Sequence, residues 1–257
     1  MNVYWMEQTE ADVPIDDNWL SADEAVHLSE LRVAKRRADW RLGRWTAKRS
    51  LSVCLEVPTR PDLLRKFETL AARSGAPEVF FDGQPVAVTI SISHRAGIAA
   101  CAVAMSSAKI GCDLEAIEPR SDAFVADYFT IEEQALVEHA SATDRDRLLA
   151  LLWSAKESAL KALHEGLRLD TRSVIVIPCS TSFDLDGWSQ LRVRNIGDTA
   201  ARAGEVHSAG HVFHGWWQEA SGIVRTVVAD PPPDAPTSLT VSAHIFDSAS
   251  DGKHVDC

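Results

Sequence analysis

The sequence lacks the patterns of several common protein classes. No apolar run approaches the roughly 18 to 20 residues that span a bilayer, and the start, MNVYWMEQTEADVP, has no basic region followed by an apolar one. The five cysteines are an odd number without a Cys-x-x-Cys pair, which disfavours a disulfide framework and a zinc site. We therefore expect a cytoplasmic protein with reduced thiols and no membrane association.

Motifs of common enzyme classes are also missing. The chain contains no Gly-x-x-x-x-Gly-Lys-Ser/Thr loop, no Gly-x-Gly-x-x-Gly, no Gly-x-Ser-x-Gly and no His-Glu-x-x-His. The first two motifs bind phosphates through glycine-rich turns, the third presents a nucleophilic serine and the fourth binds zinc. The common nucleotide-binding and hydrolase classes therefore lose support.

The charge is negative overall, but one segment is basic. The formal net charge of −11 disfavours general nucleic-acid binding. Residues 32–49 nevertheless carry eight basic side chains and the single acid Asp39. Four of the basic residues are spaced so that they share one helix face: Arg37, Arg41, Arg44 and Lys48. Like charges at these spacings repel, so either water solvates this face or an anion offsets it, and both interpretations stay open.

The order of predicted elements indicates an α+β fold. Helical periodicity from about residue 21 is followed by β-rich runs over 86–115, and the same succession returns over residues 130–228. We expect an N-terminal half over 1–115 and a C-terminal half over 116–230, similar in layout though not in visible sequence. Residues 231–257 form a C-terminal extension that we expect to be partly disordered.

Two short patterns predict helix starts. Ser21 precedes Glu24 by three residues, and Thr130 precedes Glu133 by three residues. This is the spacing of a capping box, in which the two side chains satisfy each other's backbone N–H groups. We therefore expect a helix to begin after Ser21 and another after Thr130.

Two carboxylates close a β-rich run in IGCDLE, residues 110–115. Asp113 and Glu115 stand two apart, so on a strand both side chains project from one face. Carboxylates that share one space repel each other, and magnesium or manganese prefers such oxygen ligands. An exposed acid pair at a strand end is the simpler interpretation, and this motif alone favours it.

Two other stretches carry candidate residues. In LLWSAKESALKALHEGL, residues 151–167, Glu157 stands four residues before Lys161, which is the stabilising order of an ordinary surface salt bridge. In SISHRAG, Ser93 and His94 end a β-rich run, where a histidine is more often structural than functional. A Ser-His pair beside a basic helix could also hold a phosphate.

Taken together, these motifs resemble a known enzyme family. SISHRAG, IGCDLE, YFTIEEQAL and LLWSAKESALKALHEGLRLDTRSV occur in the order and at about the distances seen in 4'-phosphopantetheinyl transferases of the surfactin-synthetase-activating (Sfp) type. The Gly-x-Asp-x-Glu signature of that family is matched by residues 111–115. A second signature of Trp, Lys, Glu and Lys is matched by Trp153, Lys156, Glu157 and Lys161. The resemblance covers nearly all of residues 1–230.

The resemblance implies a fold and a site. It implies two similar α+β halves in a pseudo-two-fold arrangement, with coenzyme A and Mg²⁺ (or Mn²⁺) at their interface. The metal ligands would be Asp113, Glu115 and Glu157. Glu157 would also be the favoured base, with Lys161 stabilising charge on the leaving side. Coenzyme A would be bound by Arg44, Lys48, Ser93, His94 and Lys161.

The resemblance also implies an activity. The 4'-phosphopantetheine arm of coenzyme A would be transferred to a serine of an apo acyl or peptidyl carrier protein, releasing adenosine 3',5'-bisphosphate. Such carriers serve fatty acid, polyketide and nonribosomal peptide synthesis, and we expect the enzyme to be a monomer. The alternatives are a non-catalytic module that binds coenzyme A or a carrier protein, and a magnesium-dependent nucleotide phosphohydrolase.

Overall fold

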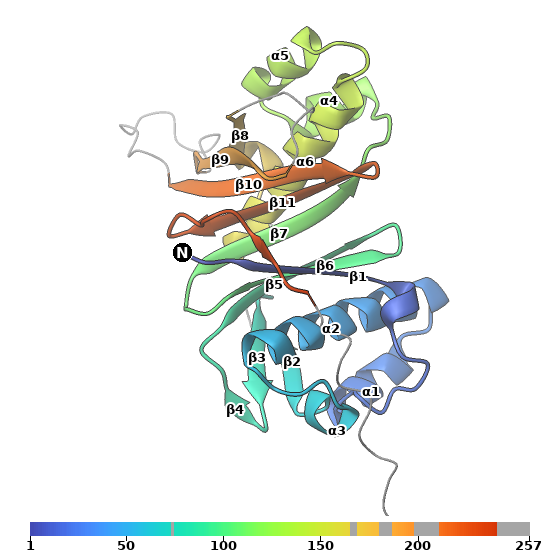
Figure 1. The fold of residues 1–257 in the computed structure, drawn as a ribbon. Helices are drawn as coiled ribbons and strands as arrows, with labels where there is room; N and C mark the ends of the chain where they lie inside the picture. Colours follow the sequence, from blue (N-terminus) through green and yellow to red (C-terminus); the bar gives the residue numbers. More distant parts are fainter. Residues whose placement is uncertain (73–74, 165–168, 180–186, 198–210, 241–257) are drawn as a thin grey trace, which may run out of the picture.

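The computed structural model describes residues 1–72, 75–164, 169–179, 187–197 and 211–240, in which helices and strands are mixed (Figure 1). This mixture confirms the predicted α+β class. No helix in these ranges combines the length and the apolar character that a membrane span requires.

One half of the molecule is built on an N-terminal sheet with strand order β12-β1-β6-β5. Its strands are β1 (Tyr4–Thr9), β5 (Thr89–Arg95), β6 (Ile98–Ala104) and β12 (Thr237–Ser238). The long helix α2 (Ala34–Cys54) packs on this sheet, next to α1 (Ala22–Glu30) and α3 (Pro61–Leu64). A small sheet beside it contains β2 (Phe67–Ala71), β3 (Pro77–Phe81) and β4 (Gln84–Pro85).

The other half is built on a sheet with strand order β7-β11-β10-β9-β8. Its strands are β7 (Lys109–Ala116), β8 (Val174–Pro178), β9 (Ser189–Asn195), β10 (Val212–Ala220) and β11 (Ile223–Asp230). The long helix α6 (Arg145–Ala162) packs on β7 and β11. Two shorter helices, α4 (Asp122–Tyr128) and α5 (Ile131–His139), lie beyond α6 (Figure 1).

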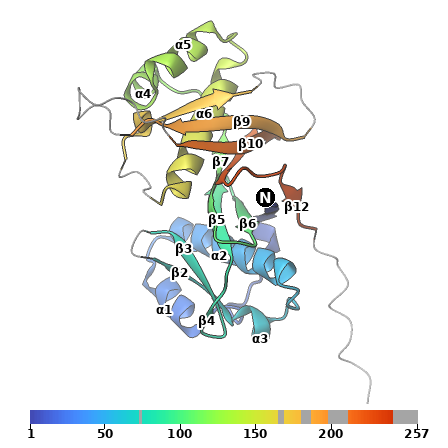
Figure 2. The same cartoon turned by 90° about the vertical axis from the view of Figure 1, so that its left-hand side faces the viewer.

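The predicted boundary between the halves falls inside β7. This strand pairs with β11 along its whole length, from Lys109 opposite Asp230 to Ala116 opposite Ile223. Residues 109–115, assigned by sequence to the N-terminal half, therefore belong to the sheet of the C-terminal half. Figure 2 shows β7 at the junction, beside β5.

Two serines join the sheets at that junction. The backbone N–H of Cys112 donates to Ser91 Oγ at 2.9 Å, and that of Leu114 donates to Ser93 Oγ at 3.2 Å. Because side chains alternate along a strand, Ser91 and Ser93 point to β7 while Ile92 packs toward the core around α2. Hydroxyl groups thus satisfy backbone donors of β7 on the side that faces β5.

The beginning of the C-terminal extension is part of the fold. Thr237 of β12 lies opposite Tyr4 in a parallel pairing with β1, and the Met1 amine donates to the carbonyl of Pro232 at 3.1 Å. Residues 231–240 are therefore attached to the N-terminal sheet. The disorder predicted for the end of the extension falls on residues outside the described ranges.

Both predicted capping boxes are confirmed. The Glu24 N–H donates to Ser21 Oγ at 3.3 Å at the start of α1, and the Glu133 N–H donates to Thr130 Oγ1 at 3.4 Å at the start of α5. In both boxes the glutamate carboxylate also accepts a hydrogen bond from the backbone N–H of the capping residue. Each capping glutamate is also buried, which the sequence pattern does not require.

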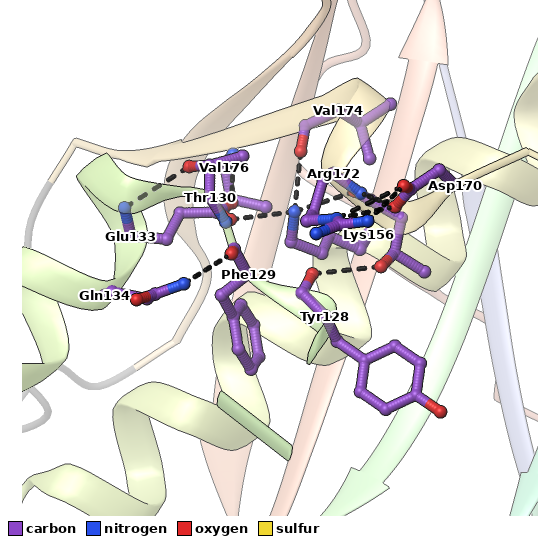
Figure 3. Close-up of polar contacts among 11 residues, drawn as sticks. Tyr128, Phe129, Thr130, Glu133, Gln134, Lys156, Asp170, Arg172, Val174 and Val176 are labelled. Atoms are coloured by element: carbon purple, nitrogen blue, oxygen red, sulfur yellow. Dashed lines mark hydrogen bonds and ion pairs between the residues drawn. The ribbon is translucent and has the colours of Figure 1, made fainter. Parts of the chain in front are cut away.

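Each buried glutamate pairs with a fully buried lysine of a long helix. Lys48 Nζ of α2 lies 2.5 Å from Glu24 Oε2, and Lys156 Nζ of α6 lies 2.8 Å from Glu133 Oε2. Figure 3 shows the second pair, in which Lys156 also donates to the carbonyl of Val174 at 2.6 Å. Each pair ties the first turn of a short helix to a long one.

A short sequence repeat accompanies this structural repeat. Residues 45–50 read WTAKRS in α2, and residues 153–158 read WSAKES in α6. The expectation that the halves share no visible sequence is therefore wrong at the long helices. The pseudo-two-fold arrangement stays a prediction, which the repeated lysine–glutamate pairs support.

Candidate functional site

The predicted carboxylates lie where α6 crosses β7. Asp113, Glu115 and Gly111 share one face of the strand by its alternation, and that face meets α6. A Cβ atom on Gly111 would stand 1.8 Å from the carbonyl oxygen of Ser158. Glycine therefore permits the close approach that brings α6, with Glu157, next to the two carboxylates.

Asp113 is held by its Oδ1 atom. This oxygen accepts hydrogen bonds from Ser93 Oγ at 2.8 Å and from Lys161 Nζ at 2.9 Å. Lys161 also donates to the carbonyl of Cys112 at 2.9 Å. The Oδ2 atom of Asp113 is buried and has no hydrogen-bond partner among the described residues. Asp113 therefore keeps one carboxylate oxygen available to a ligand.

Glu115 is paired with two arginines. Its Oε1 atom contacts Arg120 Nη2 directly and lies 3.4 Å from Arg95 Nη2, which also pairs with Glu118 at 2.9 Å. Burial raises the pKa of Glu115, and the charges of Arg95 and Arg120 act against that rise. The two arginines thus offset the free-energy cost of burying the charged Glu115 carboxylate.

Glu157 and Lys161 face the same cluster from α6. Burial raises the pKa of Glu157, the charge of Asp113 raises it further, and Lys161 opposes both. Burial acts to lower the pKa of Lys161, but the charge and hydrogen bond of Asp113, together with Cys112 and Glu157, raise it by more. Lys161 therefore stays protonated, while Glu157 takes up a proton more readily than an ordinary glutamate.

The three carboxylates do not form a ready metal site. Across the described ranges, no three His, Cys, Asp or Glu side chains are grouped so that they could hold a metal ion. Two of the carboxylates have basic partners instead, since Glu115 contacts Arg120 and the Asp113 Oδ1 atom is bound by Lys161. The donor chemistry still fits a hard divalent cation, since the neighbouring side chains are carboxylates and the buried Asp113 Oδ2 atom has no partner among the described residues.

A cavity of about 510 Å³ brings two other predicted residues together. Its lining includes Arg36, Trp40, Arg44, Ile92 and His94. The Arg44 guanidinium stacks over the Trp40 ring at 5.2 Å. The cavity therefore combines an aromatic wall, two arginines and a histidine, a set that suits an anionic ligand with an aromatic part.

Lys48 is not brought to this cavity. Its side chain is fully buried, and its amine is bound by Glu24 and the carbonyls of Trp19 and Leu64. The prediction that Lys48 binds coenzyme A does not fit this environment. Ser93 likewise points to Asp113 rather than into the cavity, so its role lies on the carboxylate side.

The basic face of α2 is partly neutralised from distant segments. Arg41 Nε lies 2.8 Å from Asp17 Oδ1, and Arg37 donates to the carbonyl of Leu28 at 2.6 Å. These partners explain how α2 tolerates like charges at helical spacing without an anion at every position. Of this face, Arg44 lies at the cavity, with its Nε atom 3.9 Å from Glu24 Oε1, and Arg36 lines the same cavity.

Arg95 and Arg120 were not predicted. Their positions offer a signal, because Arg95 directly follows the Ser-His pair and Arg120 follows the acid-rich IGCDLEAIEP. A buried acid pair needs counter-ions, so basic residues next to both motifs were candidates.

Comparisons with known proteins match part of this chain to one family model and to a solved structure. No curated protein matches the chain. A crystal structure of Helicobacter pylori holo-[acyl-carrier-protein] synthase in complex with coenzyme A is similar at 18% identity and a TM-score of 0.32, covering 39% of this chain and 96% of that chain. Residues 109–216, which include Asp113, Glu115, Glu157 and Lys161, match the family model ACPS, described as the 4'-phosphopantetheinyl transferase superfamily.

Proposed function

We propose that the protein is a 4'-phosphopantetheinyl transferase of the Sfp type. It transfers the arm of coenzyme A to a serine of an apo acyl or peptidyl carrier protein and releases adenosine 3',5'-bisphosphate. The observation that carries the proposal is the convergence of Asp113, Glu115, Glu157 and Lys161 where α6 crosses β7. The family match over residues 109–216 supports it.

The cavity beside α2 is the proposed site for coenzyme A. Its 3'-phosphate would be recognised by charged hydrogen bonds from His94 and Arg44, with Arg36 contributing charge. Trp40 offers an aromatic surface for the adenine. Lys48 is left out of this assignment because its amine is fully engaged by Glu24.

The proposed cation is Mg²⁺, with Mn²⁺ as a substitute. Asp113, Glu115 and Glu157 would hold it, and when bound it would neutralise the pyrophosphate that otherwise repels an incoming hydroxyl group. Lys161, which stays protonated beside Asp113, supplies a second positive charge from the protein itself.

The residues of this chain then carry the following chemistry. Glu157 accepts the proton of the carrier serine, whose oxygen forms a bond to the phosphorus that bears the pantetheine arm. The bond from that phosphorus to the bridging oxygen breaks, and the electron pair leaves with adenosine 3',5'-bisphosphate. Lys161 stabilises the charge that develops on the leaving side. Burial raises the pKa of Glu157 whereas a bound cation would lower it, so the assignment of Glu157 as the base rests on the resemblance to the family.

The test is transfer to a carrier protein. The protein is incubated with coenzyme A, Mg²⁺ and a panel of apo carriers, and mass spectrometry is expected to show a gain of roughly 340 Da on the acceptor, the mass of the arm. Binding without any mass gain would identify a non-catalytic module. Release of adenosine bisphosphate without a modified carrier would identify a phosphohydrolase.

A variant pair tests the base. Glu157→Gln is expected to lower the transfer rate by about 100-fold or more while the far-UV spectrum stays unchanged, because the amide can neither take the proton nor replace the carboxylate as a ligand of the cation. Glu138→Gln, an exposed position on α5, makes the same chemical change away from the site and should transfer normally. Near-normal turnover by Glu157→Gln would remove Glu157 from the mechanism.

A further inference from the structure

Arg120 forms an ion pair with Glu115, a carboxylate that the proposed cation site would use as a ligand. Its Nη2 atom is in direct contact with Glu115 Oε1, the same oxygen that Arg95 approaches at 3.4 Å. Arg95 has another partner in Glu118, at 2.9 Å. Arg120 is therefore the arginine in direct contact with Glu115, while Arg95 acts on it from a longer distance.

The backbone at Arg120 is fixed while its side chain is only partly covered. The Arg120 carbonyl accepts a hydrogen bond from Arg145 Nη1 at 3.1 Å, and Arg145 pairs with Asp122 at 2.8 Å. The guanidinium stacks over the Phe124 ring at 4.9 Å, and 24% of the side chain is exposed. The hydrogen bond that Arg145 makes to the Arg120 backbone does not depend on the contact between the Arg120 side chain and Glu115.

We propose that Arg120 competes with the divalent cation for Glu115, so that cation binding requires Arg120 to release this carboxylate. The proposal rests on the proposed function, since it assigns Glu115 to the cation site. It explains why three neighbouring carboxylates and an unpartnered Asp113 oxygen do not assemble into a metal site here. Arg120 is a positioning residue that sets the affinity for the cation.

Direct measurement of cation binding tests the competition. Free Mn²⁺ is followed by its electron paramagnetic resonance signal while purified protein without coenzyme A is titrated. Arg120→Gln removes the competing charge and is expected to bind Mn²⁺ about fivefold more tightly than the unmodified protein. Arg120→Lys keeps a charge but loses the planar fork, so its affinity should lie between the two.

A matched control and the contrary outcomes complete the experiment. Arg172→Gln removes the same charge from an exposed arginine paired with Asp170, and its Mn²⁺ affinity should not change. Weaker binding by Arg120→Gln would mean that Arg120 orients Glu115 for the cation. Unchanged binding would mean that the two do not compete. Either result, or the absence of Mn²⁺ binding by all variants, overturns the inference.

The inference and the proposed function fail separately. Transfer of the arm to a carrier, measured by mass, tests the function without reference to Arg120. If transfer occurs and Arg120→Gln leaves the Mn²⁺ affinity unchanged, only the competition is wrong. If no carrier gains mass, the function is wrong whatever the titration shows.

Discussion

Lys48 and Lys161 show how burial and neighbours decide what one side chain can do. Both lie on long helices and both pair with a carboxylate, at 2.5 Å and 2.9 Å respectively. Lys48 is fully buried and its amine is hydrogen-bonded to other protein groups, whereas 29% of the Lys161 side chain is exposed. The first lysine stabilises the fold, and the second can act on a ligand.

His94 provides a test of ligand recognition at this scale. Dephospho-coenzyme A lacks the 3'-phosphate that His94 is proposed to contact. His94→Ala should therefore raise the KM for coenzyme A by about tenfold, the loss of one charged hydrogen bond, and leave the KM for dephospho-coenzyme A nearly unchanged. Steady-state transfer with both substrates measures this difference.

The control for His94 is His139→Ala. His139 is an exposed residue of α5 whose ring bonds the carbonyl of Ala135, so its removal should alter neither KM. Equal changes in both KM values for His94→Ala would show that His94 contacts another part of the ligand.

Among the elements, the crossing of α6 and β7 depends most on a single position. Gly111→Ala would place a methyl group against the backbone of α6, 1.8 Å from the Ser158 carbonyl oxygen and 2.8 Å from the Ala162 nitrogen. Backbone atoms cannot move aside as a flexible side chain can. We expect a loss of about 3 kcal/mol in the free energy of unfolding, measured by urea denaturation.

Gly43→Ala in α2 is the matched comparison. Its new methyl group would lie 3.5 Å from Ile92 Cγ2, an ordinary contact, and alanine is the better helix former by about 0.5 to 1 kcal/mol. This variant should be as stable as the unmodified protein or more so. If both alanines were equally tolerated, the tight crossing at Gly111 would not be real.

Local sequence patterns predicted the helices and strands better than they predicted contacts between side chains far apart in the sequence. The capping residues Ser21 and Thr130 and the strand carrying Asp113 follow from spacings within a few residues, and the structure has them. The burial of Lys48 does not follow, because its partner Glu24 lies 24 positions away and either residue alone looks exposed. The contact of Ser93 with Asp113, which depends on two strands of different sheets, was equally inaccessible.

At the candidate site too, local spacings were predictable from the sequence and long-range partners were not. The spacing of Asp113 and Glu115 predicted a shared face, and the i, i+4 relation of Glu157 and Lys161 predicted neighbouring side chains on a helix. Neither spacing predicts the ion pair between Arg120 and Glu115, because that contact depends on how the chain turns after β7.

At the scale of the whole molecule, a partly buried ion pair joins β1 of the N-terminal sheet to β11 of the other large sheet. Arg225 of β11 contacts both carboxylate oxygens of Glu7 in β1, at 2.5 and 2.9 Å, and also donates to the carbonyls of Ala220 and Ile223. Arg225→Met would leave Glu7 without its cation. We expect this variant to lose about 1 to 3 kcal/mol in the free energy of unfolding, because Glu7 stays partly exposed to water.

A double-mutant cycle checks that this loss belongs to the pair. Adding Glu7→Gln to Arg225→Met removes the unpaired charge and should restore part of the stability. Arg172→Met breaks only the exposed pair with Asp170 and should leave the free energy of unfolding nearly unchanged. Additive losses in the double variant would show that Glu7 and Arg225 act independently.

The repeat of WTAKRS and WSAKES bears on stoichiometry. The lysines occupy equivalent places in the two helices, yet the next residue is Arg49 in α2 and Glu157 in α6. Arg49 is 8% exposed and stacks over Trp45 at 5.5 Å, so the place that holds an acid in one helix holds a covered cation in the other. The proposed set of carboxylates therefore occurs at α6 and not at the matching place in α2, and we expect a titration with coenzyme A to saturate at one equivalent per chain.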